Sequence, residues 1–261
     1  SLLSTILLTG LFTSASHAQE VPKAQRGAYA LTNATIVTVS DGTIENGTLV
    51  IDADGKIAAL GTAVEAPAGA EVIDCSGHYI YPGMIDGGTH LGLSEVGSIS
   101  LTQDYNEIGN VTPHMQALTA VNPNSVAIPV TRVNGVTTVL AAPSGGLLPG
   151  TAALINLVGY TPGQMYAGFK GVVMNFPSSG RRSRWDRRSD EERKKEEEKA
   201  LRELNEVWDQ ALLYHRIDSA ARAKGETPEY NPPMQALLPV LRGESTLLIE
   251  VDRENDIKKA L

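Results

Sequence analysis

The order of apolar and polar positions divides the chain into a β-rich first part and a mixed second part. Between Tyr29 and Asp74, β-branched runs at 34–39, 48–52, 56–60 and 71–73 alternate with clusters of turn-forming residues. Such short, evenly spaced runs predict strands. The Asp54-Gly55 pair between two of the runs predicts a hairpin. We therefore expect a small β-domain over residues 29–78, either a small sheet or part of a β-sandwich.

The second part combines strand-like runs with helical segments. Val136–Leu140 is a β-branched run that follows Gly135, and the segment before this glycine predicts a helix with Val130 and Val133 on its inner face. A helix, a glycine stop and a strand follow one another as in a βα unit. Further strands are expected at 152–158, 171–175 and 245–251, and a proline-initiated helix at 231–241. The pattern favours the α/β fold class.

A highly charged segment interrupts this rhythm. Ser189 and Glu192 have the spacing of a capping box, and Gly225 stands at the expected stop. Between them, apolar or half-polar residues recur at helical spacing at Leu201, Leu204, Trp208, Ala211, Leu212 and His215. We expect a long helical insertion at about 187–225 with a solvated first half. A lid or a partner surface is the functional alternative to a plain exposed insertion.

The N-terminal residues have the pattern of an export signal. An apolar run from Leu2 to Phe12 is followed by small residues that end at Ala18. Small side chains before a cleavage point fit a signal peptidase, which predicts that residues 1–18 are part of a signal peptide. The run is too short to remain as a membrane anchor. A periplasmic or secreted protein is expected, with a buried N-terminal helix as the alternative.

Composition narrows the class of partner. The formal net charge of −8 and the isoelectric point of about 5.2 argue against a nucleic-acid partner. Cys75 is the only cysteine, so the chain can form no internal disulfide. A hydrophobic content of 42% is ordinary for a globular protein, which makes a core-stabilised domain the expected form.

One stretch carries candidate chemistry, YIYPGMIDGGTHLGL at 79–93. His90 follows a short apolar strand through a run of small residues, a setting in which a ring nitrogen can reach a metal or a substrate. A histidine satisfied within a Gly-rich turn is the alternative. The motif PGMIDGGTH resembles the first barrel strand of the amidohydrolase superfamily, where PG-hydrophobic-ID precedes His-x-His. His90 matches the second, metal-ligating histidine, and Gly88 stands in place of the first.

The resemblance implies a fold as well. Relatives begin with a β-domain and continue into a (β/α)8 TIM-type barrel, so residues 79–261 correspond to the N-terminal part of such a barrel. GVTTVL at 135–140 is similar to the second barrel strand. A complete barrel needs about 250 residues, so an incomplete chain is expected. The similarity points to the imidazolonepropionase-like branch.

A second family motif is altered near the C-terminus. In similar proteins a His-x-His pair follows a strand, and these positions fall here on Glu250 and Asp252. The resemblance thus implies a metal site of His90, Glu250 and Asp252. Zinc is our first choice, with iron or manganese as alternatives because carboxylates are harder ligands than imidazole. The family's proton-shuttle aspartate would lie beyond Leu261.

Other residues offer weaker candidates. Glu95 and Asp104 lie in the loop after His90. Lys170 directly precedes the strand expected at 171–175, and some relatives carry a carbamylated, metal-bridging lysine on a middle strand, but no local signal gives Lys170 that role. The glycines of the loop at 142–150 could let the backbone approach an anionic ligand, or could belong to a mobile surface loop.

The resemblance implies a metal-dependent hydrolase that cleaves carbon–nitrogen bonds of a small amide, cyclic amide or peptide-like substrate through a metal-activated water. The alternative, from a different class, is a catalytically silent binding or structural protein that kept the scaffold and lost the metal site. A homo-oligomer is compatible with either.

Overall fold

The computed structural model describes residues 27–180 and 185–260, and the predicted signal segment 1–18 lies outside them. The chain forms two compact units that divide after Pro82. Each unit is described by itself. Among the described helices, none is both long and apolar enough to cross a bilayer.

The N-terminal unit is a five-stranded sheet. Its strands are β1 (Tyr29–Val37), β2 (Thr43–Ile51), β3 (Ile57–Gly61), β4 (Glu71–Asp74) and β5 (Tyr79–Ile80). The order is β3-β2-β1-β4, with β5 also paired to β1. Ala34, Ile36 and Leu49 form its core. The described residues of this unit make one sheet, so the second layer of the expected sandwich stays a prediction.

The hairpin predicted at Asp54-Gly55 is present between β2 and β3. The Asp52 carboxylate accepts hydrogen bonds from the backbone N–H groups of Asp54 at 3.0 Å and Lys56 at 2.8 Å. Gly55 has φ +75°, a conformation that glycine adopts without a steric penalty. The turn therefore follows from local chemistry alone. At the other end of the unit, β5 pairs with Thr35 and Ile36, which extends the unit to Pro82 and past the expected boundary at residue 78.

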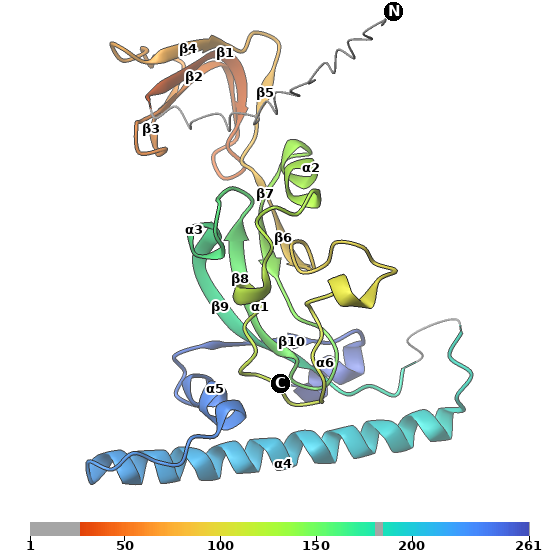
Figure 1. Cartoon of the computed structure of the whole chain (residues 1–261). Coiled ribbons are helices and arrows are strands. Elements are labelled where there is room, and N and C mark those ends of the chain that lie inside the picture. The colour runs from red at the N-terminus through yellow and green to blue at the C-terminus, as the bar shows by residue number, and fades with distance from the viewer. Residues whose placement is uncertain (1–26, 181–184, 261) are drawn as a thin grey trace, which may run out of the picture. The chain divides into compact units, whose positions relative to one another are not determined.

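The second unit is built on another five-stranded sheet (Figure 1). Its strands are β6 (Met84–Thr89), β7 (Val136–Ala141), β8 (Gly150–Asn156), β9 (Tyr166–Asn175) and β10 (Thr246–Glu250), in the order β10-β9-β8-β7-β6. The helical segments are η1 (Ser100–Thr102), α1 (Ala117–Ala120), α2 (Ala127–Val133), α3 (Pro162–Met165), α4 (Asp190–Ala223), α5 (Pro232–Leu241) and α6 (Glu254–Ala260). The sheet curls like part of a barrel wall (Figure 1).

The sheet departs from an alternating βα pattern at β8. β6 and β7 are parallel, as are β9 and β10, but β8 runs antiparallel to both of its neighbours. A parallel connection needs a crossover of a dozen or more residues, and the short loop between Ala141 and Gly150 cannot provide one. The run expected at 152–158 is therefore a strand, but it does not begin a βα unit.

The helix expected before Gly135 is present as α2, but its predicted inner face is wrong. Val130 and Val133 are 61% and 80% exposed, whereas Ile128 is buried in the core with Val139 of β7. Because α2 has only seven residues, a single apolar side chain on its inner side is enough to attach it.

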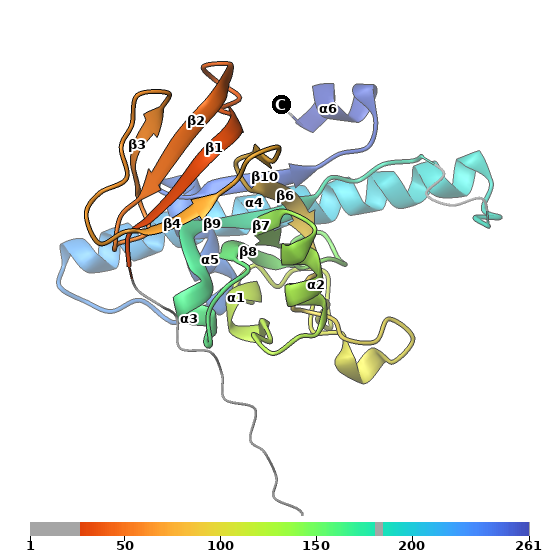
Figure 2. The same ribbon diagram turned by 90° about the horizontal axis from the view of Figure 1, so that it is seen from above.

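The long charged helix expected at 187–225 is α4. Ser189 and Glu192 form the predicted capping box, and Gly225, with φ +75°, follows its C-terminal end. Leu204, Val207 and Ala211 pack with α5 and with Val172 and Met174 of β9. Both views show α4 alongside β9 and β10, away from α2 (Figures 1 and 2). The helix is thus part of the crossover from β9 to β10.

The prediction that the first half of α4 is solvated is wrong at two charged residues. Arg193 and Glu197 are buried. The ammonium group of Lys259 in α6 donates to Glu197 at 2.8 Å, which holds the pKa of Glu197 below its usual range. The guanidinium of Arg193 donates to the backbone oxygens of Ser179 and Arg188. These partners come from outside α4, so the helix pattern alone could not reveal them.

Candidate active site at the carboxyl edge of the sheet

His90 directly follows β6 at the carboxyl end of the strand. Its imidazole stacks on the ring of Tyr105, with centroids 3.9 Å apart and planes 5° apart. Its backbone oxygen accepts a hydrogen bond from Leu93 N–H at 2.8 Å, and Leu93 is fully buried. The side chain and the backbone of His90 are therefore both held by the loop that follows β6.

The electrostatic setting of His90 favours a neutral ring. Partial loss of water around the imidazole lowers its pKa, and the negative charge of Glu250 acts in the opposite direction as the smaller effect. A histidine with a lowered pKa is largely neutral at pH 7, so one ring nitrogen keeps a free lone pair. That lone pair is what a metal ion or a proton on a substrate would use.

Glu250 ends β10 at the same edge of the sheet. It pairs in register with Asn175 of β9, and its backbone oxygen accepts from Phe176 N–H at 3.1 Å. Asp252 lies two residues further on and is exposed. Of the three predicted ligands, His90 and Glu250 come within electrostatic reach of each other.

The described residues do not complete a metal site. The part of the chain that the structure describes contains no group of three His, Cys, Asp or Glu side chains that could hold a metal ion. His90 and Glu250 have suitable donor atoms, and a third donor does not converge with them. At Gly88, which stands in place of the family's first histidine, an added Cβ would meet no atom within 4 Å. The backbone there leaves room for a side chain.

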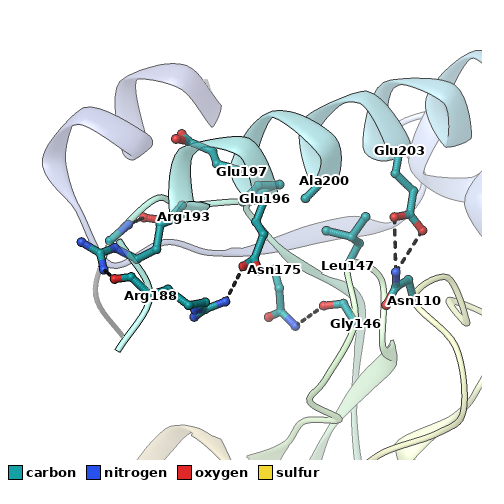
Figure 3. Close-up of a pocket in the computed structure, with 13 residues that line it drawn as sticks. Asn110, Gly146, Leu147, Asn175, Arg188, Arg193, Glu196, Glu197, Ala200 and Glu203 are labelled. Carbon is teal, nitrogen blue, oxygen red and sulfur yellow. Dashed lines mark hydrogen bonds and ion pairs between the residues drawn. The ribbon is translucent and has the colours of Figure 1, made fainter. Parts of the chain in front are cut away.

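A polar cavity of about 280 Å³ lies near this edge, between α4 and the loops that end β7 and β9 (Figure 3). One wall is formed by Asn110, Gly146 and Asn175, and the other by Glu196, Ala200 and Glu203 of α4. The Asn175 amide donates to the Gly146 oxygen at 2.9 Å, and the Asn110 amide donates to both carboxylate oxygens of Glu203 at 3.1 and 3.2 Å.

Two glycines of the loop before β8 lie against other segments of the chain. A Cβ at Gly146 would lie 2.8 Å from the backbone oxygen of Asn110, and one at Gly150 would lie 2.8 Å from that of Met115. Both glycines have positive φ. Close packing of two chain segments accounts for them, because any larger residue would collide with backbone.

The other candidates have ordinary surroundings. Glu95 accepts a hydrogen bond from Asn122 at 2.9 Å. Lys170 donates to the Gln116 side chain at 3.1 Å and lies 5.6 Å above the Tyr166 ring. By contrast, sequence reasoning missed Tyr105, Asn110 and Glu203, since no local pattern shows that they meet residues far along the chain.

Comparison with known proteins shows what the fold resembles. The structure matches an amidohydrolase from Thermotoga maritima with a TM-score of 0.75 and 24% sequence identity, covering 89% of this chain and 60% of that one. The fold is therefore that of an amidohydrolase. No protein-family model matches the sequence.

Sequence similarity covers shorter stretches. The chain is 40% identical over 89 residues to a D-hydantoinase of Geobacillus stearothermophilus, 42% over 62 residues to a deacetylase of Agrobacterium fabrum, and 36% over 93 residues to an adenine deaminase of Dehalococcoides mccartyi. These matches span 34%, 23% and 31% of this chain, but only 18%, 15% and 16% of the relatives. The chain therefore spans less than a fifth of the length of these relatives in each match.

Proposed function

We propose that the protein is a hydrolase that cleaves carbon–nitrogen bonds in a small amide, cyclic amide or peptide-like substrate. The relatives named above are a hydantoinase, a deacetylase and an adenine deaminase, and enzymes of these kinds hydrolyse carbon–nitrogen bonds. The observation that carries the proposal is the neutral imidazole of His90 beside the charge of Glu250, at the carboxyl edge of an amidohydrolase-like sheet. Active sites of barrel enzymes are built at that edge.

We further propose that the reaction depends on a divalent metal, held in part by His90 and Glu250. A bound metal supplies a water of lowered pKa and polarises the scissile carbonyl. This chain would contribute two ligands, the neutral ring nitrogen of His90 and the carboxylate of Glu250. Asp252 is our choice for a third ligand, since it follows the same strand. Zinc fits the imidazole best, while iron or manganese would suit the two carboxylates.

The test is elemental analysis of the full-length protein beside His90→Ala, Glu250→Ala and Asp252→Ala. We expect about one metal ion or more per wild-type chain, as in catalytic zinc sites, and loss of metal in each variant. His78→Ala is the matched control, because His78 is an exposed histidine of the N-terminal unit. If the wild-type protein takes up no metal after loading with zinc, manganese and iron, the proposal of a metal-dependent reaction is wrong.

A second candidate function has an observation of its own. Gly88 replaces a residue that supplies a ligand in the family, which favours a silent binding protein on the same scaffold. A screen of amide and cyclic amide substrates separates the two candidates. Turnover that disappears in His90→Ala supports the hydrolase, and ligand binding without turnover supports the silent protein.

The imidazolonepropionase-like branch, the sandwich form of the N-terminal unit and export to the periplasm or medium also remain proposals. The export proposal rests on the apolar run and the small residues before Gln19. N-terminal sequencing of the mature protein should begin at Gln19. A mature protein that retains Leu2–Phe12 would contradict it.

A further inference from the structure

The cavity beside α4 has an uneven distribution of charge. Three carboxylates of α4 line it, Glu196, Glu197 and Glu203. Glu196 pairs with the guanidinium of Arg188, and Glu197 pairs with Lys259. Two of the three negative charges are therefore neutralised within the protein.

The two arginines in the lining are already paired within the protein. Arg188 uses Nε and a terminal nitrogen for the Asp186 carboxylate, both at 2.8 Å, and its other terminal nitrogen for Glu196. Arg193 is buried and donates to Asp190 and to backbone oxygens. Three of the five N–H donors of each guanidinium are thus engaged, and carboxylates offset both positive charges.

Glu203 differs from the other two carboxylates. It is half-buried, and its partner among the described residues is the neutral amide of Asn110. Figure 3 shows the Glu203–Asn110 pair at one end of the cavity and the arginines at the other, with Ala200 and Leu147 between them. The Glu203 end of the cavity thus keeps an uncompensated negative charge, and the small side chain of Ala200 leaves the space beside it open.

The cavity and the candidate active site are connected by two paired residues on neighbouring strands. Asn175 lines the cavity and pairs in register with Glu250. Residues paired on neighbouring strands have side chains on the same face of a sheet. Val172 and Met174 face α4, so alternation along β9 places Asn175 and Glu250 toward the other face of the sheet. A substrate that reaches Glu250 would pass over the end of β9 at Asn175 to reach Glu203.

We propose that this cavity binds the cationic end of the substrate, and that Glu203 determines specificity for a protonated amine or guanidinium. The inference rests on the proposed hydrolase function and adds its substrate class, an amide or peptide-like compound with a basic side chain. A half-buried carboxylate held by two hydrogen bonds from one amide is already oriented, so a cation meets it without a large loss of side-chain freedom.

The test compares two probes that differ mainly in charge, Nα-acetyl-L-lysinamide and Nα-acetyl-L-norleucinamide. Isothermal titration calorimetry on the full-length protein should show roughly fivefold or more tighter binding of the lysine probe, the preference expected from a single favourable ion pair. Glu203→Gln keeps an acceptor for Asn110 and should remove the preference. Glu206→Gln, an exposed neighbour on α4 outside the cavity lining, should keep it.

A second variant locates the binding site. Ala200→Leu fills the middle of the cavity and should weaken both probes without abolishing the preference for charge. Equal binding of the two probes to wild type, absence of binding, or a preference that survives Glu203→Gln would overturn the proposal. The titrations are repeated on metal-depleted protein, where hydrolysis plays no part. A preference retained there, together with no turnover of amide substrates by the metal-loaded protein, would leave the cation site standing while the hydrolase function fails.

Discussion

The imidazole of His90 lies parallel to the phenol ring of Tyr105, at a centroid distance of 3.9 Å. The backbone oxygen of Tyr105 in turn accepts from Ser144 N–H at 2.8 Å. Ser144 belongs to the loop after β7, so the ring that covers His90 is attached to the neighbouring strand. Tyr105 acts as a positioning residue, because it restrains the orientation of His90 and shields one face of the imidazole from water.

Removing this ring should change the titration of His90. In Tyr105→Ala the imidazole regains water, and we expect its pKa to rise toward the ordinary value of 6.5. Tyr105→Phe keeps the stack and should leave the pKa lowered. NMR titration of the His90 ring measures the change, with Tyr160→Ala, an exposed tyrosine of the same unit, as the control. An unchanged pKa in Tyr105→Ala would mean that the ring does not desolvate His90.

Glu250 should act on the same group with the opposite sign. Its negative charge raises the pKa of His90, so Glu250→Gln should lower that pKa further. Glu254→Gln is a control, since Glu254 is exposed and paired with Lys258 in α6. The same NMR titration reports both variants. A shift upward in Glu250→Gln would contradict the electrostatic contact.

The lowered pKa of His90 also gives stability a pH dependence. Below about pH 6.5 the unfolded chain takes up a proton at this histidine more readily than the folded chain does. The free energy of unfolding should therefore decrease as the pH falls from about 6.5 toward the folded-state pKa. Urea unfolding at pH 7.5 and 5.5 measures the decrease, and His90→Gln should reduce it. If both proteins lose the same stability on acidification, His90 does not contribute.

Gly88 offers a gain-of-function test. The position has no atom within 4 Å of an added Cβ and its φ is not in the left-handed region, so Gly88→His should be accommodated. The variant would recreate a His-x-His pair with His90, and a second imidazole should tighten zinc binding by at least tenfold, since outer-shell partners alone alter metal affinity by about 10–100-fold. Zinc titration against a competing chelator measures this. Gly87→His, one residue away on the other face of the strand, should give no gain.

Substituting Asp218 tests the contact between α4 and the C-terminal end of α5. Its carboxylate is fully buried and accepts from Arg222 at 2.8 Å and from Arg242 at 2.8 Å. Asp218→Ala should lower the free energy of unfolding by about 2 kcal/mol, because both guanidinium groups lose a charged hydrogen-bond partner but can still reach water. Asp209→Ala, at an exposed position of the same helix, should change it by less than about 0.5 kcal/mol. Equal effects in a urea titration would rule out a special role for Asp218.

Local signals in the sequence predicted local structure well. The limits of α4 followed from Ser189, Glu192 and Gly225, and the strand β7 followed from its β-branched run. Each of these features is decided by residues within a few positions of one another. The position of His90 at the end of β6 was predictable for the same reason.

Features that depend on distant partners could not be predicted. Asn110 and Glu203 are 93 positions apart, and no sequence signal near either residue predicts their contact. The burial of Glu197 depends on Lys259, and the direction of β8 depends on how a short loop returns the chain. A hydrophobic pattern records which residues avoid water, but not which distant group neutralises a charge.

The placement of α4 and α5 between β9 and β10 has a consequence for folding. The two strands are adjacent and parallel, yet all of α4, with its 34 residues, and all of α5 must be made before β10 can pair. Closing so long a connection lowers the chain entropy before the pairing of β10 with β9 can offset that loss. We expect α4 and α5 to dock on each other first and β10 to pair with β9 last. The backbone amides of β10 should then exchange with solvent earlier than those of the other strands of this sheet.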